Sequence, residues 1–482
     1  MFASLVTRWP RQLMALTAMV AMVPIGEVGA HSEFPTIQSM VSIDDKQQGH
    51  WLLATTFGLL DTIDAGKTVQ WRCEAAYGKD SPAMDASLVR LPGGLLVATG
   101  GKLFASKDGG CNWSAVTGSL GDRWVWQVQR TDAQPKNAWM VAAKPGQTQS
   151  IWRGDPFASD GLKPVYQTQE HELRRLRFAA SKPGTIRALA WLKGQVTETS
   201  LLASDDDGKT WALKKLTGVP GFLQLLPIHP DNPGILHVHA INDDIHHSVW
   251  RSSNDGKSFD KVLALKPIVT LQAGIWQAGV GGPVLLVGGL TGGLWRSVDG
   301  GQHFEAVANA PQIGCLARLD DGLYACSNPY IDGPALMRSD DAGLSWSAVL
   351  CFDTIDGPRT CNGAQSVEAA CTEEWPELAK KLQFSNEGAC GSGQAGQGDA
   401  GGGEDGFHDS GGATPDVGQA GDAEVLEADA DSTTDAPPTT VKPDNDGCTA
   451  SPSGASPSAW LLLWTLAWLS TRIRRRRDPL SR

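Results

Sequence analysis

The chain has 482 residues, among them 53 acidic residues, 41 lysines and arginines, 9 cysteines and 18 tryptophans. A formal net charge of −12 is the opposite of the basic composition typical of nucleic-acid-binding proteins, and we expect no nucleic-acid partner. The length allows one large domain or two to three smaller ones.

Residues 1–30 have the pattern of a secretory signal peptide. Arg8 and Arg11 precede an apolar run from Leu13 to Pro24, and Val28-Gly29-Ala30 is a small-residue cleavage site. We therefore expect cleavage before His31 and export of the mature protein.

Five copies of one eight-residue motif follow along the chain. Each copy has Ser, any residue, Asp or Asn, any residue, Gly, two further residues and an aromatic, and each comes after a short apolar strand ending in Ala or Arg. The motif residues are Ser106, Asp108, Gly110 and Trp113; Ser204, Asp206, Gly208 and Trp211; Ser252, Asn254, Gly256 and Phe259; Ser297, Asp299, Gly301 and Phe304; and Ser339, Asp341, Gly343 and Trp346.

The motif has the composition of a hairpin turn with its own apolar anchor. Ser and Asp two residues apart can bond nearby backbone amides, Gly supplies a positive φ, and the aromatic returns to the apolar side, where we expect it to be buried. The motif resembles the Asp-box, or BNR repeat, of sialidases, sortilin-type receptors and many bacterial surface proteins. The resemblance implies that the box residues are structural, and we assign none of them a catalytic role.

The spacing of the boxes predicts an all-β, seven-bladed β-propeller over residues 31–350. The box aromatics at 211, 259, 304 and 346 are 48, 45 and 42 residues apart, whereas the first gap, from 113 to 211, is 98 residues. We place a decayed copy near residues 154–161 and a degenerate one from Thr62 to Val69, which makes seven repeats. Repeats of this length with several short strands are typical of propellers.

Residues 351–390 form a small cysteine-rich module after the last box. The module holds Cys351, Cys361, Cys371 and Cys390, with a possible short helix at residues 373–382. We expect disulfides that staple it as a cap onto the last blade, and a zinc site as the rival, disfavoured by the lack of a close cysteine pair. Elsewhere, the short separation of Cys315 and Cys326 in the sequence favours a disulfide between them. The sequence leaves the other cysteine pairings open.

The last two segments have compositions of their own. Residues 391–447 contain 13 glycines and 13 acidic residues against one lysine, which predicts a disordered acidic linker.

Residues 448–482 begin at Cys448, continue into a short apolar run from Ala459 to Leu469 and end in an arginine cluster. This order resembles the MYXO-CTERM sorting tag. It implies processing or lipidation at Cys448 and anchoring at the cell surface or outer membrane; an unprocessed membrane helix is the alternative.

The densest cluster of potential metal ligands is the run of residues 236–247. His237 and His239 lie two apart on a predicted strand, and the chain turns back towards His246. These three imidazoles are the candidate ligands for a weakly bound metal, with ordinary strand histidines as the alternative. We expect no other cofactor.

The remaining chemistry favours binding over catalysis. The Arg-Ile-Pro signature of sialidases is absent from the sequence, although two carboxylates of another glycoside hydrolase cannot be recognised by spacing alone. Trp124 and Trp126 share one face of a predicted strand, where they either stack on a sugar or pack between blades. We therefore expect a monomeric, surface-displayed propeller that binds a protein or polysaccharide through the face opposite the boxes, with a secreted carbohydrate-active enzyme as the alternative.

Overall fold

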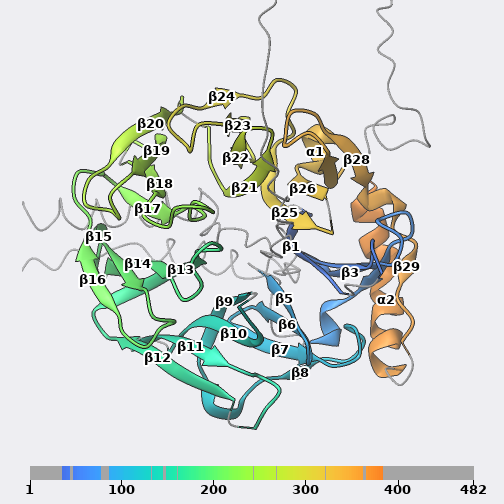
Figure 1. Ribbon diagram of the computed structural model, residues 1–482. Coiled ribbons are helices and arrows are strands. Elements are labelled where there is room, and N and C mark those ends of the chain that lie inside the picture. Colours follow the sequence, from blue (N-terminus) through green and yellow to red (C-terminus); the bar gives the residue numbers. More distant parts are fainter. Residues whose placement is uncertain are drawn as a thin grey trace, which may run out of the picture.

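The computed structural model describes residues 35–383 except 44–46, 78–85, 132, 145–147, 160, 243, 267–268, 321 and 362–364. In this part of the chain, seven antiparallel sheets stand around a central axis as the blades of a propeller (Figure 1). The predicted all-β fold and the count of seven blades are confirmed. The predicted signal peptide, the whole linker 391–447, the tag and Cys448 lie outside the described residues.

Each blade is formed by four consecutive strands, with the first near the axis and the fourth at the periphery (Figure 1). The blades are, in order, β1 (Ile37–Ser42), β2 (Trp51–Thr55), β3 (Gly58–Thr62) and β4 (Gln70–Arg72); β5 (Ser87–Leu91), β6 (Gly94–Thr99), β7 (Lys102–Ser106) and β8 (Ser114–Ala115); β9 (Trp124–Thr131), β10 (Gln134–Ala143), β11 (Gln149–Gly154) and β12 (Leu162–Thr168); β13 (His171–Phe178), β14 (Ile186–Leu192), β15 (Gln195–Ser204) and β16 (Ala212–Lys215); β17 (Phe222–Leu225), β18 (Leu236–Ile241), β19 (His247–Ser252) and β20 (Asp260–Ala264); β21 (Ala273–Gly279), β22 (Gly282–Gly289), β23 (Gly293–Ser297) and β24 (Glu305–Ala306); and β25 (Ile313–Leu319), β26 (Gly322–Ser327), β27 (Leu336–Ser339) and β28 (Ser347–Leu350). We number these blades 1 to 7.

Every predicted box lies between the third and fourth strands of its blade. Because the strands alternate in direction, these turns share one face of the ring with the loops between first and second strands, and we call it the box face. The segment 155–161, where the decayed copy was placed, occupies the box position of blade 3 between β11 and β12. Thr62–Val69 occupies that position in blade 1.

The box in blade 4 illustrates how the motif makes its turn. Ser204 Oγ donates to Asp206 Oδ1 at 2.9 Å and accepts the Gly208 N–H at 2.9 Å, while Asp206 Oδ1 accepts the Thr210 N–H at 2.8 Å. The equivalent bonds recur in the boxes that begin at Thr62, Ser106, Ser252, Ser297 and Ser339. The degenerate copy therefore keeps the hydrogen bonding of the full motif, with threonine in place of serine.

The prediction of buried box aromatics was wrong. Trp113, Trp211, Phe259, Phe304 and Trp346 are all half-buried. They stand just before the short fourth strand, at the periphery of the ring, where the neighbouring blade covers only part of each side chain. The indole N–H of Trp211 donates to Gly208 O at 3.0 Å, so its hydrogen-bond donor is satisfied within its own turn.

Side chains from one blade bind the box of the next. The fourth residue of each box has a positive φ, and in five boxes its carbonyl accepts a hydrogen bond from a cation outside the box. The pairs are Arg359 with Gly109, Arg153 with Asp207, Lys214 with Asp255, Arg251 with Gly300, and Arg296 with Ala342. All but the first cation come from the preceding blade, so the boxes also join neighbouring blades.

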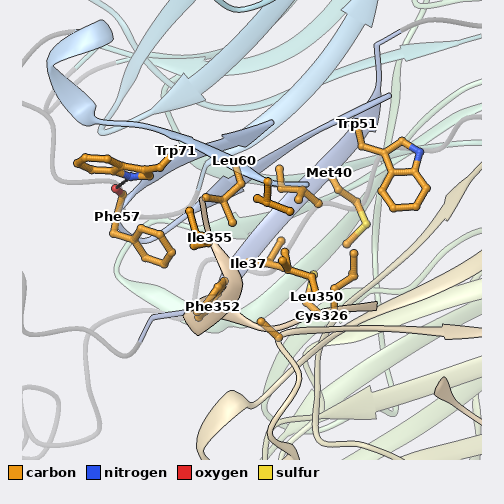
Figure 2. Packing of buried hydrophobic residues seen from close by; sticks show 14 of the residues in the cluster. Ile37, Met40, Trp51, Phe57, Leu60, Trp71, Cys326, Leu350, Phe352 and Ile355 are labelled. Carbon is orange, nitrogen blue, oxygen red and sulfur yellow. Dashed lines mark hydrogen bonds between the residues drawn. The ribbon is translucent and has the colours of Figure 1, made fainter. Parts of the chain in front are cut away.

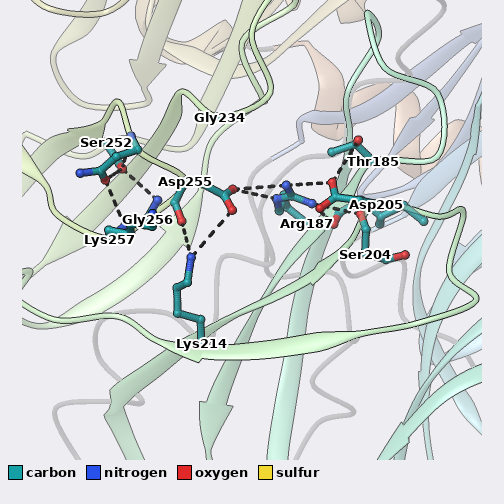
Figure 3. Close-up of polar contacts among 12 residues, drawn as sticks. Thr185, Arg187, Ser204, Asp205, Lys214, Gly234, Ser252, Asp255, Gly256 and Lys257 are labelled. Carbon is teal, nitrogen blue, oxygen red and sulfur yellow. Dashed lines mark hydrogen bonds and ion pairs between the residues drawn. The ribbon is translucent and has the colours of Figure 1, made fainter.

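Arg187 of β14 strengthens this contact between blades 4 and 5 (Figure 3). The buried guanidinium lies between the carboxylates of Asp205 and Asp255, at 3.1 and 3.2 Å. Lys214 approaches Asp255 from a second side, with Nζ 3.8 Å from Oδ2. Charge-assisted hydrogen bonds of this kind are stronger than neutral ones.

The inner strands of blades 1 to 4 are joined by hydrogen bonds from side chain to backbone. Gln38 and Ser39 of β1 accept the N–H groups of Ala86 and Leu88. Further along the ring, Ser87 bonds the backbone of Val128, and Gln127 bonds that of Leu176. These polar side chains satisfy backbone groups along the inner edge of the ring, which has no fifth strand to pair with.

The cysteine-rich segment after the ring closes it against blades 1 and 2. Short β29 (Gly357–Pro358) runs parallel to β4, and α2 (Gln365–Leu382) contains the predicted helix and begins eight residues earlier. Disulfides join Cys73 to Cys371 and Cys111 to Cys361. The module was predicted to cap the last blade; it lies instead on blades 1 and 2, because closure of the ring brings the chain leaving blade 7 beside blade 1. We call residues 351–382 the clasp.

The core under the clasp spans both ends of the ring. Phe352 and Ile355 of the clasp pack with Ile37 and Phe57 of blade 1 and Leu350 of blade 7 (Figure 2). A buried ion pair joins Arg359 to Asp61 of β3. The predicted Cys315–Cys326 disulfide is present within blade 7, and Cys351 is also disulfide-bonded. Cys361 and Cys371 are thus not available as thiolate ligands, and the rival zinc site is not supported.

Candidate functional site

The three histidines predicted as metal ligands do not converge. His237 Nε2 faces the Gly301 carbonyl of blade 6 at 3.3 Å, on the box face, whereas His239 Nε2 lies 2.8 Å from His247 Nδ1. The half-buried His246 bonds through its backbone N–H to Asn242 Oδ1. Groups of three or more His, Cys, Asp or Glu able to hold a metal ion are absent from the described residues, so the structure does not bring the predicted ligand set together.

The adjacent residue, His247, is the one that faces His239 across the hairpin. His247 Nδ1 also accepts the N–H of Leu271 at 3.1 Å, which leaves this nitrogen committed to hydrogen bonds. Burial lowers the pKa of His247 to about 4, and burial together with the nearby Arg251 lowers that of His237 to about 3. Burial and the neighbouring His247 also hold the pKa of His239 well below its usual value. The three imidazoles are therefore neutral packing residues at pH 7.

Trp124 is the exposed member of the tryptophan pair in β9. Its relative exposure is 59%, and it stands where the inner strand of blade 3 begins, on the face opposite the boxes. The indole lies against the Gly101 turn of blade 2, where a Cβ atom would come within 3.2 Å of Trp124 Cγ. The Val125 N–H donates to Gly101 O at 2.9 Å and fixes this position. More than half of the Trp124 surface is exposed to solvent, so packing between blades does not account for this residue.

Trp126 is half-buried and takes part in packing between blades. The Arg174 guanidinium of β13 lies over its ring at 5.8 Å from the centroid, and over the ring of Trp191 at 4.8 Å. Arg174 Nη2 also pairs with Glu172 Oε2 at 3.2 Å. Two indoles from neighbouring strands and a carboxylate from its own strand hold this guanidinium, so its position is set by the surrounding structure.

The same face continues into blade 5 through another aromatic contact. Phe222, the first residue of β17, lies with its ring centroid 4.1 Å from that of Trp191. The side chains of Glu172 and Arg174 are 36% and 31% exposed. We define the aromatic rim as Trp124, Trp126, Glu172, Arg174 and Phe222, which come from the inner strands of three consecutive blades.

The sequence analysis identified only the two tryptophans of this rim. Glu172 and Arg174 were missed, although the sequence His-Glu-Leu-Arg places them two apart and hence on one face of a strand. What the sequence lacks is the register between blades, which brings Arg174 to Trp126 from a strand about 48 residues further on.

A second concave region lies on the box face between blades 3 and 4. It is a cavity of about 60 Å³ lined by residues that include Arg130, Phe178, Pro183, Thr185 and Asp207. It has room for a few water molecules, too little to accept a ligand of the size expected for a binding propeller. The helices in the described part of the chain are all too short or too polar to cross a membrane.

Known family profiles and curated proteins give no match to the chain. Solved structures with a similar fold include YCF48 bound to D1 peptide, which is 16% identical over 64% of this chain and 94% of that one, with a TM-score of 0.43. The GH74 xyloglucanase from Xanthomonas campestris is 13% identical over 65% and 66% of the two chains (TM-score 0.36), and a chain of the nidogen/laminin complex is 10% identical over 55% and 92% (TM-score 0.35). At these TM-scores the similarities indicate no function for this chain; its own seven sheets identify the fold as a β-propeller.

Proposed function

We propose that the chain is an exported, surface-displayed binding protein, whose protein or polysaccharide ligand contacts the aromatic rim. The exposed indole of Trp124 is the observation that carries this proposal. Tryptophan has the largest apolar side chain and is highly buried on average, so an exposed one is typical of a binding surface. On the other face, the backbone carbonyls of five boxes already accept hydrogen bonds from neighbouring blades or the clasp.

Export is supported by sequence and by disulfides together. Two disulfides close the ring through cysteines far apart in the sequence, and disulfides persist in oxidising compartments outside the cytosol. Residues 1–30 supply a signal-peptide pattern, and residues 448–482 resemble a sorting tag with Cys448 as the processing site. Anchoring at the cell surface or outer membrane would leave the long acidic segment 391–447 between the membrane and the propeller.

Hydrolysis of a glycoside is the competing function on the same face. That reaction ordinarily uses two carboxylates about 5–10 Å apart, one as acid and the other as base or nucleophile. Within the described residues, the carboxylate of Glu172 has its ionic contact with Arg174, and the aromatic rim contains no other acid. The rim therefore supplies one of the two groups, and binding is the function that it supports better.

Surface plasmon resonance with the purified full-length protein tests the proposal. Candidate ligands are envelope polysaccharides and envelope proteins from the source cell, and binding of one of them should weaken at least tenfold when Trp124 is replaced by Ala. Thermal unfolding of the variant should match that of the unmodified protein. Bond cleavage in the bound polysaccharide, lost in Glu172→Gln, would replace the binding function with the enzymatic one.

A further inference from the structure

We infer that the aromatic rim takes a neutral polysaccharide. This inference rests on the proposed function and narrows it to one class of ligand. It follows from the charge of the rim, from the chemistry of its polar pair and from its extent over three blades.

The one acid and the one base of the rim pair with each other. Glu172 and Arg174 form an ion pair with 3.2 Å between Oε2 and Nη2, and each retains about a third of its side-chain surface in solvent. An acidic ligand that approaches Arg174 meets the carboxylate of Glu172, and a basic ligand that approaches Glu172 meets the guanidinium. Rejection of a charged partner by a like charge is a common source of specificity.

The same pair suits hydroxyl groups. A guanidinium only donates hydrogen bonds and a carboxylate only accepts them, whereas a hydroxyl does both. Two neighbouring hydroxyls of a sugar ring can therefore accept from Arg174 and donate to Glu172 at once. Because the guanidinium is held between Trp126 and Trp191, its donors are oriented before the ligand arrives, which reduces the entropy lost on binding.

Trp124 supplies an apolar surface on the same face, at the start of the inner strand of the preceding blade. The indole is supported by the Gly101 turn and is 59% exposed, so the C–H face of a pyranose can stack on it without displacing protein atoms. The turn is built of two glycines, Gly100 and Gly101, both with positive φ, and Gly101 leaves the space in which the indole rests.

The rim draws on three consecutive blades. Trp124 begins the inner strand of blade 3, Arg174 lies in that of blade 4, and Phe222 begins that of blade 5. Contacts spread over three blades suit consecutive residues of a chain, with one sugar at Trp124 and the next ones towards Phe222. A monosaccharide would leave most of these groups unused.

Affinity electrophoresis of the full-length protein in gels that contain one polysaccharide each tests this assignment. The neutral probes are glucan, mannan, xylan and galactan; the anionic probes are polygalacturonate and alginate, and chitosan is the cationic one. We expect retardation by at least one neutral probe, unchanged between 50 and 500 mM NaCl, and none by the charged probes. Salt weakens ionic contacts between exposed charges over this range. A neutral ligand makes no ionic contact with the rim, so its binding should not depend on salt.

Two variants give the decisive readouts. Trp124→Ala should weaken retardation by the neutral probe about tenfold or more, Trp124→Phe should retain part of it, and Tyr330→Ala, which truncates an exposed aromatic on the same face in blade 7, should retain all of it. Glu172→Gln leaves Arg174 uncompensated, so it should weaken binding of the neutral probe and create salt-sensitive retardation by polygalacturonate. Circular dichroism and thermal unfolding establish that each variant is folded.

The outcomes separate the inference from the proposed function. Strong, Trp124-dependent retardation by an anionic or cationic probe, or Trp124-dependent binding of an envelope protein, would overturn the neutral polysaccharide and leave the binding function standing. Ligand binding that is indifferent to Trp124 in every assay would overturn both.

Discussion

Arg153 of blade 3 holds the box of blade 4 by its residue Asp207. Arg153 Nη1 donates to the Asp207 carbonyl at 2.9 Å, and Nη2 lies 2.7 Å from the Asp207 carboxylate. The guanidinium also lies over the Trp139 ring, 5.0 Å from its centroid. One side chain therefore fixes the backbone of a turn that is 54 residues away in the sequence.

Replacing Arg153 by Ala should lower the free energy of unfolding by about 2–3 kcal/mol, because a charge-assisted hydrogen bond and a cation–π contact are lost together. Urea denaturation measures this effect. Lys215→Ala is the control: Lys215 pairs with the exposed Glu198 in its own blade at 2.8 Å, and its loss should cost less than about 1 kcal/mol. Equal costs for the two variants would show that the contact between blades adds nothing.

Gly301→Ala should be among the most damaging single-methyl changes in the chain. Gly301 has φ +78°, and a Cβ atom there would lie 2.0 Å from His237 Nε2 of the preceding blade. We expect a loss of about 2–4 kcal/mol from overpacking and backbone strain. Gly109→Ala is the control, because Gly109 has a similar φ of +69° but nothing within 4 Å of an added Cβ. Its cost should be only about 1 kcal/mol.

The double variant Gly301→Ala, His237→Ala separates the two causes. Removal of the imidazole should relieve the overpacking part of the Gly301→Ala cost and leave the strain. Strictly additive costs in the double-variant cycle would contradict the contact that the structure shows.

Opening the clasp should destabilise the ring more than opening a local disulfide. With Cys111–Cys361 intact, the Cys73–Cys371 bond closes a path of 38 residues from Cys73 to Cys111 and 10 from Cys361 to Cys371. In the chain-entropy description it therefore contributes about 1 kcal/mol more than the Cys315–Cys326 bond, with a separation of 11. All four cysteines are buried, so the two Cys→Ala pairs have similar packing losses. Calorimetry of both double variants tests the order, which would be contradicted by a larger effect at Cys315–Cys326.

Stability should fall between pH 6.5 and 5, before most carboxylates titrate. Burial lowers the pKa of His237 to about 3 and that of His247 to about 4, against about 6.5 in an unfolded chain. A depressed native pKa means that the unfolded chain takes up the proton first, so the stability contributed by neutral imidazole is complete above about pH 6.5 and is lost towards pH 3–4. Each such histidine adds a slope of about 1.4 kcal/mol per pH unit. Urea midpoints for His237→Gln should show a shallower slope; an unchanged slope would show that His237 is not buried in its neutral form.

The C-terminal prediction concerns residues outside the described range. If residues 448–482 are a sorting tag, surface-extracted protein should lack the arginine cluster and remain with the envelope through Cys448. Mass spectrometry of that protein is the measurement. Recovery of a peptide containing Arg474 to Arg477 would instead favour an unprocessed membrane helix.

The features predicted well from sequence are those repeated in it. Seven blades followed from the box spacing, and the same arithmetic located the strand connection at residues 155–161, where the motif itself has decayed. The repeated motif forms the same local hydrogen bonds in each box, such as that between Ser204 and Gly208, so its spacing predicts where each blade lies.

Contacts between repeats were predicted poorly, because they depend on which blade is adjacent and in what register. Cys361 and Cys371 were expected to staple blade 7, yet they pair with Cys111 and Cys73 across the ring closure. His246 was chosen over His247 because a hairpin of unknown register does not tell which of two adjacent residues faces inward. The guanidinium between Trp126 and Trp191 was missed for the same reason.

The clasp also fixes an order of events during biogenesis. Cys73 and Cys111 are made long before Cys371 and Cys361, and until the seventh blade is in place each has only non-native thiols to react with. The native cross-links become possible when the polypeptide has completed its circuit and returned to its starting point. Formation of these two cross-links is then the last oxidation step, and early oxidation of Cys73 or Cys111 would produce isomers that a disulfide-exchange catalyst must undo.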